Sequence, residues 1–147
     1  MIRQPHRKSA ALASMLLLWA ASPASAAPAP QPVDMGFTAN GQVSVDAANV
    51  KTRSGRRTGW KQVQATVELN QPVHYAAREI TREVQTQDWD CPDARYRVIL
   101  RVFRTNDGGF VRSERKISSW MSVPKEGAGR ATFELLCPKT AISSEGG

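Results

Sequence analysis

The chain has 147 residues, with 20 lysines and arginines against 13 acidic residues, and it contains two cysteines and two histidines. This length suits one small domain. The scarcity of Cys and His argues against a zinc site or a histidine-dependent catalytic triad, because only His74 lies beyond the first 26 residues. We therefore predict a non-enzymatic protein without metal or cofactor.

Residues 1–26 have the pattern of a secretory signal peptide. A basic start with Arg3, Arg7 and Lys8 precedes an apolar run over residues 10–21, which is shorter than the roughly 20 residues that span a bilayer. The small residues at 24–26 fit a cleavage site after Ala26, and an N-terminal membrane anchor is the alternative. Cleavage would remove three basic residues and no acidic one, leaving a net charge of +4. We expect export to the periplasm, the medium or the cell surface, and no lipoprotein, because no cysteine lies near the cleavage site.

The first predicted elements form a hairpin. Residues 27–34 are rich in Pro and Ala and are typical of a linker. Strands are expected at 35–40 and 42–46, because Asn40-Gly41, where the first strand ends, is a strong hairpin signal. Asp46 begins a short turn that its carboxylate can cap, and a short extended piece over 50–53 leads to a second turn.

Two longer elements follow. Residues 60–69 alternate between apolar and polar side chains, which predicts a strand, and the Asn-Gln-Pro sequence at 70–72 is expected to end it because proline cannot donate to a ladder. The apolar face of this strand consists of Val63, Ala65, Val67 and Leu69. Residues 78–90 allow a helix, since Ile80 and Val84 lie four positions apart, but their β-branched and polar residues favour a strand.

The clearest strand is predicted at residues 95–104, where alternation over ten positions indicates a half-buried central strand. One face is expected to carry Tyr96, Val98, Leu100 and Val102. The other face is expected to carry Arg95, Arg97, Ile99, Arg101 and Phe103. The Asn-Asp-Gly-Gly turn at 106–109 predicts a hairpin to a polar edge strand over 110–117, and a loop over 118–125 contains Trp120.

The C-terminal part of the chain predicts a helix and a disulfide. Residues 126–136 place Ala and Leu at helical spacing, with a strand as the alternative, and 139–147 are expected to form a flexible tail. Cys91 and Cys137 are the only pair available for a bridge in an oxidising compartment. We predict an α+β domain over 35–138, mainly an antiparallel β-sheet with one C-terminal helix packed on a face and one disulfide.

The acidic residues offer little support for catalysis. The pairs Glu79 with Glu83 and Asp88 with Asp90 contain the residue type that glycosidases use. Neighbouring arginines favour ordinary solvated carboxylates instead, so we assign no catalytic residue. A small hydrolase acting through these pairs is kept as a hypothesis beside the two binding and structural hypotheses stated below.

Basic residues gather at two places. The first cluster surrounds the turn at 54–55 and consists of Lys51, Arg53, Arg56, Arg57 and Lys61. The second cluster lies on the predicted central strand and consists of Arg95, Arg97 and Arg101. Arginine and aromatic side chains together bind anionic polymers, whereas arginine stems can also simply cover a thin sheet. The first cluster is the candidate site for an anionic ligand, and export argues against nucleic acid.

The order of several short motifs resembles the surface-adhesin protein E family of Gram-negative bacteria over about residues 35–138. These motifs are Asp46 with Val50, the strand at 60–69, Trp89-Asp90-Cys91, Arg95-Tyr96-Arg97, Gly108-Gly109, Trp120, Val123-Pro124 and Cys137. The resemblance implies an antiparallel sheet with a helix and one disulfide, binding of host extracellular-matrix and serum proteins, and pairing into a homodimer. It assigns no binding residue, and the chain lacks the lipid-anchor cysteine of the adhesin.

Two functional hypotheses follow from these observations. The first is a non-enzymatic exported binding domain whose partners are host extracellular-matrix or serum proteins, or anionic glycans and lipids. The alternative is a soluble periplasmic protein with an envelope or structural role and no host partner.

Overall fold

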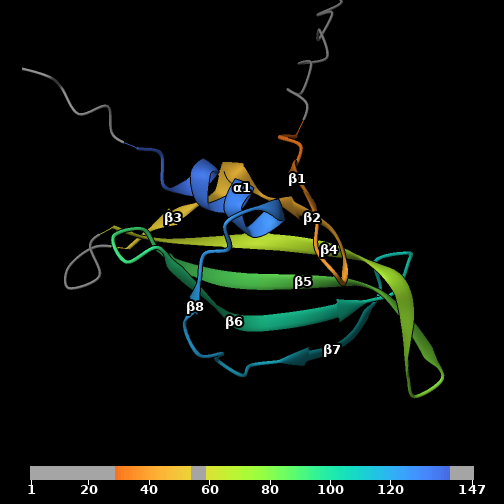
Figure 1. Ribbon diagram of the computed structural model, residues 1–147. Coiled ribbons are helices and arrows are strands. Elements are labelled where there is room, and N and C mark those ends of the chain that lie inside the picture. The colour runs from red at the N-terminus through yellow and green to blue at the C-terminus, as the bar shows by residue number, and fades with distance from the viewer. Residues whose placement is uncertain (1–28, 54–58, 140–147) are drawn as a thin grey trace, which may run out of the picture.

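A computed structural model of the protein describes residues 29–53 and 59–139 (Figure 1). The predicted signal peptide and the tail beyond residue 139 lie outside these residues. The strands are β1 (Val33–Phe37), β2 (Gly41–Val45), β3 (Lys51–Thr52), β4 (Trp60–Tyr75), β5 (Arg78–Asp90), β6 (Arg95–Arg104), β7 (Phe110–Glu114) and β8 (Met121–Ser122). The helices are a 3₁₀ helix, Ala47–Asn49, and the α-helix α1 (Gly127–Leu136).

The strands form one antiparallel sheet of order β1-β2-β4-β5-β6-β7, with β3 beside β4 and β8 beside β6 (Figure 1). Both predicted hairpins are confirmed, the first between β1 and β2 and the second between β6 and β7. Gly108 in the second turn has φ +85°, a left-handed conformation that glycine adopts without strain. The segment 78–90, for which a helix and a strand were both open, is strand β5.

Strand β4 is longer than predicted. The sequence at 70–72 was expected to end it, but the strand continues to Tyr75. Its register against β5 shifts between Glu68 and Val73, and Pro72 lies in this irregular stretch. Because no regular ladder bond is required there, the proline is accommodated within the strand. The predicted end of β4 was therefore wrong.

Strand β6 is confirmed, and its predicted faces are correct up to Val98 but wrong beyond it. Val98 pairs with Gln87 and Leu100 pairs with Thr86, so Ile99 is an extra residue that forms a β-bulge. Side chains beyond the bulge exchange faces relative to a regular strand. One face carries Tyr96, Val98, Arg101 and Phe103. The opposite face carries Arg95, Arg97, Leu100 and Val102.

We call the face of the sheet that carries Val63, Val67 and Trp89 the inner face, and the opposite one the outer face. Figure 1 shows α1 above the inner side of the sheet. The buried core consists of Val43, Val45, Val63, Ala65, Val67, Trp89, Ala128 and Leu136. Trp89 is only 1% exposed and stacks on Tyr96 with a centroid separation of 4.6 Å. The predicted helix is thus confirmed, and its buried residues join the strands in one core.

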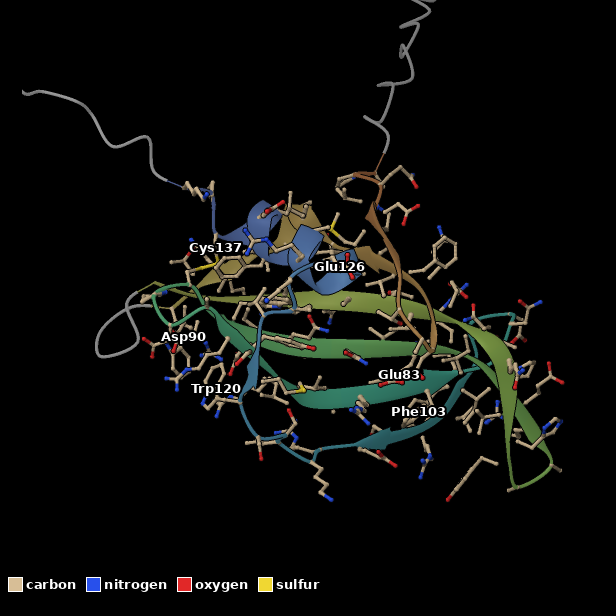
Figure 2. The ribbon with its side chains drawn as sticks, in the orientation of Figure 1. Glu83, Asp90, Phe103, Trp120, Glu126 and Cys137 are labelled. Carbon is tan, nitrogen blue, oxygen red and sulfur yellow. A yellow bond between two sulfur atoms is a disulfide. The ribbon has the colours of Figure 1, made fainter. Side chains whose placement is uncertain are left out.

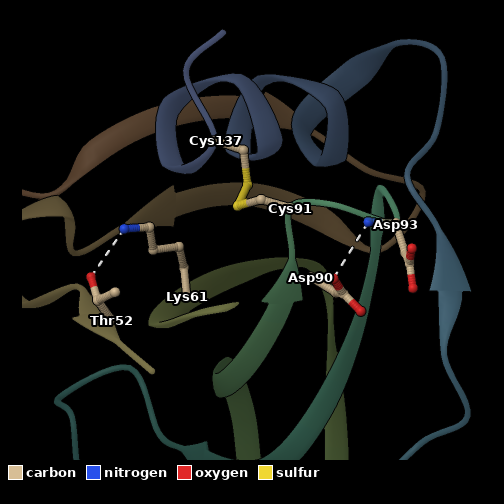
Figure 3. Close-up of a disulfide and its surroundings, with 6 residues drawn as sticks. All are labelled: Thr52, Lys61, Asp90, Cys91, Asp93 and Cys137. Carbon is tan, nitrogen blue, oxygen red and sulfur yellow. Dashed lines mark hydrogen bonds between the residues drawn. A yellow bond between two sulfur atoms is a disulfide. The ribbon is translucent and has the colours of Figure 1, made fainter. Parts of the chain in front are cut away.

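The predicted disulfide between Cys91 and Cys137 is confirmed, with a Cα–Cα distance of 5.5 Å (Figure 3). Cys91 directly follows β5, and Cys137 directly follows α1. The bond therefore ties the end of the helix to the turn that precedes β6.

Several boundaries differ from the predictions. β1 begins at Val33, within the predicted linker. Asp46 does not cap the following turn, because its carboxylate accepts a hydrogen bond from the Asn49 side chain at 2.7 Å. β7 ends at Glu114, and the predicted loop at 118–125 contains β8. In the described part of the chain, neither helix is long and apolar enough to cross a membrane.

Candidate functional site: the basic and aromatic outer face

The outer face places two arginines of β6 over two buried carboxylates of β5. The register pairs Asp88 with Arg97 and Asp90 with Arg95. Asp88 and Asp90 are 2% and 3% exposed, and their carboxylate oxygens lie 3.1 Å and 3.0 Å from the nearest arginine nitrogens. Gln62 donates a further hydrogen bond of 2.9 Å to Asp88. Buried charges need such partners, so these arginines are fixed in place and largely neutralised.

Two tryptophans complete this arrangement. The rings of Trp60 and Trp120 meet edge to face with centroids 4.8 Å apart. The Arg97 guanidinium lies 4.6 Å from the Trp120 centroid and 5.5 Å from that of Trp60, and Arg95 lies 4.9 Å from Trp120. These are cation–π distances. Figure 2 labels Trp120 and Asp90 at the same end of the sheet.

An open cavity of about 480 Å³ adjoins this cluster on the outer face and collects three arginines. Its lining contains Arg53, Arg97 and Arg115, and also apolar side chains. The apolar lining consists of Ile99, Leu100 and Ile117. Within the described part of the chain, neither Arg53 nor Arg115 has an acidic partner, whereas Arg97 is paired with Asp88. The cavity therefore presents excess positive charge beside apolar surface.

The structure divides the predicted first basic cluster. Lys51 pairs with Gln62, and the Arg53 amide donates to the Trp60 carbonyl, which places both residues beside the outer face. Lys61 instead points to the inner side, where its Nζ donates to the Thr52 hydroxyl at 3.0 Å (Figure 3). The remaining predicted members of the cluster, Arg56 and Arg57, lie outside the described residues.

The predicted second basic cluster is also divided. Arg101 follows the bulge and lies on the inner face, where its Nε is 3.2 Å from the Glu83 carboxylate. The sequence predicted that Arg101 shares a patch with Arg95 and Arg97, and this prediction was wrong. Arg115 takes a place on the outer face that the sequence did not assign to it, since its position depends on the path of the chain after β7.

The acidic pairs lie among basic partners. Glu79 is 3.8 Å from His74, and both side chains are exposed. Glu83 contacts Arg101, and both aspartates of the second pair contact arginines. Among the described residues, no group of three or more His, Cys, Asp and Glu side chains is arranged to hold a metal ion.

The fold formed by this sheet and helix is similar to that of protein E. No family model matches the sequence, and no curated protein matches it. A structure of Haemophilus influenzae protein E is similar, with a TM-score of 0.57 at 13% identity over 71% of this chain and 83% of that chain. Crystal form II of the same protein gives 0.55 at 13% identity over 65% and 79%. At this identity the likeness is one of fold alone.

Proposed function

We propose that the protein is a non-enzymatic binding domain that holds an anionic polymer on its outer face. The observation that carries this proposal is the cavity shared by Arg53, Arg97 and Arg115. Asp88 compensates one of these three charges, so the pocket retains an excess of about two positive charges. An extended polyanion such as a sulfated glycan can reach several such charges at once, because its own charges repeat along the chain.

The neighbouring sequence supports an extended contact. Lys51 lies on the strand that leads to Arg53, and Arg56 and Arg57 follow within four positions. Trp60 and Trp120 supply partly exposed aromatic surface next to the arginines. Because the acidic pairs contact basic residues, binding is better supported than hydrolysis.

The partner and the compartment belong to the same proposal. The sequence resemblance implies an exported protein that binds host matrix or serum proteins, and the protein E-like fold is compatible with that role. A periplasmic protein with an envelope or structural role is the alternative, and there the polyanion would belong to the cell itself. Protease treatment of intact cells separates them, because it degrades a surface protein and spares a periplasmic one.

Retention on immobilised heparin tests the binding site. We expect the wild-type protein to be retained, and R53E and R115E each to elute at clearly lower salt, because each replaces a contact with a repulsion. R130E is the matched control, since it makes the same charge change on α1, where Arg130 pairs with Glu134 at 2.8 Å. If all three variants lower the eluting salt concentration equally, the binding depends only on net charge, and the assigned site is refuted.

A further inference from the structure

The inner face of β5 carries a continuous ladder of polar side chains. Trp89 Nε1 donates to Gln87 Oε1 at 3.0 Å, and Gln87 Nε2 donates to Gln85 Oε1 at 2.7 Å. Gln85 Nε2 then donates to Glu83 Oε1 at 2.9 Å, and Arg101 approaches the same carboxylate at 3.2 Å. The ladder therefore connects four successive inward positions of one central strand.

The two ends of the ladder fix the orientation of both carboxamides. The indole of Trp89 can only donate a hydrogen bond, so the oxygen of Gln87 must face it. The carboxylate of Glu83 can only accept while it is ionised, so the nitrogen of Gln85 must face that end. Each glutamine consequently keeps one N–H and one oxygen lone pair that the ladder does not use.

The residues of the ladder line a cavity between the sheet, α1 and the β1–β2 hairpin. Its volume is about 440 Å³, and Glu83, Gln85 and Gln87 belong to its lining. Phe37 and Met121 also line it, and they are 66% and 36% exposed. A second cavity of about 500 Å³ continues from Glu83 toward Phe103, and Figure 2 labels both residues at one end of the sheet. The result is a trough in which the polar ladder of β5 lies beside apolar side chains.

We propose that this trough binds an extended peptide segment of a partner protein. Alternate residues of a strand repeat at roughly 6.6–6.8 Å, and an extended peptide presents its own N–H and C=O groups to one side at the same interval. A peptide lying along β5 can therefore give one carbonyl and one amide to each glutamine in register. Its side chains would then contact Phe37 and Met121, as in other peptide-binding grooves that combine main-chain bonds with side-chain pockets.

The position of the ladder favours ligand binding over a purely structural role. Across the sheet, Gln85 and Gln87 pair with Ala65 and Val63, both of which are almost completely buried. Apolar residues would extend this core, whereas polar groups with unused bonding capacity reduce its stability. A ligand that forms hydrogen bonds with those groups offsets this cost. This site lies on the opposite face of the sheet from the anionic site and is independent of it.

A peptide selection with the whole protein tests the proposal. Phage-displayed random dodecapeptides are selected on the wild-type protein, and the enriched sequences are synthesised. We expect these peptides to shift the side-chain amide NMR signals of Gln85 and Gln87. We also expect Q85L to bind them about tenfold more weakly, because a donor and an acceptor are lost together. R53E, which changes only the outer face, should bind them with unchanged affinity.

Three results would overturn the proposal. They are the absence of any enriched peptide, enriched peptides that leave both glutamine side-chain signals unmoved, and equal affinity for the wild-type protein and folded Q85L. The NMR measurement uses the unmodified protein, so it decides the question even where Q85L fails to fold. An oligosaccharide that moves these signals when no peptide does would also count against a peptide ligand.

Discussion

Strand β5 buries polar side chains in different ways on its two faces. On the inner face, the ring centroids of Trp89 and of Phe133 in α1 are 6.4 Å apart. The Trp89 indole donates a hydrogen bond to the neutral side-chain amide of Gln87. On the outer face, Asp88 and Asp90 are equally inaccessible although α1 lies on the opposite side of the sheet (Figure 1). Burial on this face depends on arginine and tryptophan side chains that pack against one another over the strands.

The comparison shows that long side chains can replace a second layer of secondary structure. Arg97 covers Asp88 with its guanidinium and packs against both tryptophans, so one residue provides both charge compensation and cover. The inner face obtains its cover from backbone elements and a covalent bond. The outer face should therefore respond to changes in charge, and the inner face to changes in the docking of the helix.

The largest effect is expected from breaking the covalent tie of the inner layer. Cys91→Ser removes the bond that joins the end of α1 to the turn before β6, and we expect the free energy of unfolding to fall by about 2–5 kcal/mol. Chemical denaturation under non-reducing conditions measures the change. Cys137→Ser and the double variant should lose the same amount, and an unchanged melting temperature in Cys91→Ser would contradict a stabilising role for the bridge.

A loss in the lower half of that range is expected from breaking the cover of the outer face. Asp88→Ala leaves Arg97 without its carboxylate, and because the Arg97 side chain is only 18% exposed, we expect a cost of about 3 kcal/mol. The control is Glu134→Ala, which removes an exposed partner of Arg130 and should cost less than about 1 kcal/mol. Equal losses in urea denaturation would mean that the outer ion pair contributes no more than a surface pair.

The smallest effect on stability is expected at the β6–β7 turn, which covers neither face of the sheet. Hydrogen bonds from the Thr105 hydroxyl and the Gly109 amide lower the pKa of the Asp107 carboxyl. A lowered pKa stabilises the folded turn above the ordinary aspartate value of about 4 and ceases to do so as the pH falls through the lowered value. The Gly109 amide signal should follow this titration in NMR. Asp107→Asn should abolish the pH dependence while leaving both faces of the sheet intact.

Local chemistry explains which parts of the fold were predictable from the sequence. The Asn40-Gly41 and Gly108-Gly109 turns, the helix and the cysteine pair were all indicated by nearby residues. The bulge at Ile99 was not, because apolar residues occupy both faces beyond it and the alternation continues without interruption. One inserted residue reversed every later side chain, and this is why Arg101 was assigned to the wrong face.

The two candidate sites were predictable to different degrees. Lys51 and Arg53 were identified from their charge, but Arg115 shares a cavity with Arg53 only through tertiary structure. The inner ladder left a detectable signal, since Glu83, Gln85 and Gln87 stand in phase with Trp89 at two-residue spacing. That signal is ambiguous in the sequence, because the same spacing is typical of a solvent-exposed strand face.

The order of the strands also bears on how the chain folds. From β4 to β7, strands that follow one another in sequence also lie side by side, so each can add to the last by closing a short loop. Helix α1, in contrast, contacts β1 from the far end of the described chain, and its docking must bear the entropy of closing a long loop. We expect the sheet to form before the helix docks. During that interval the apolar inner face is open to solvent and prone to aggregation, which makes it a natural target for chaperones.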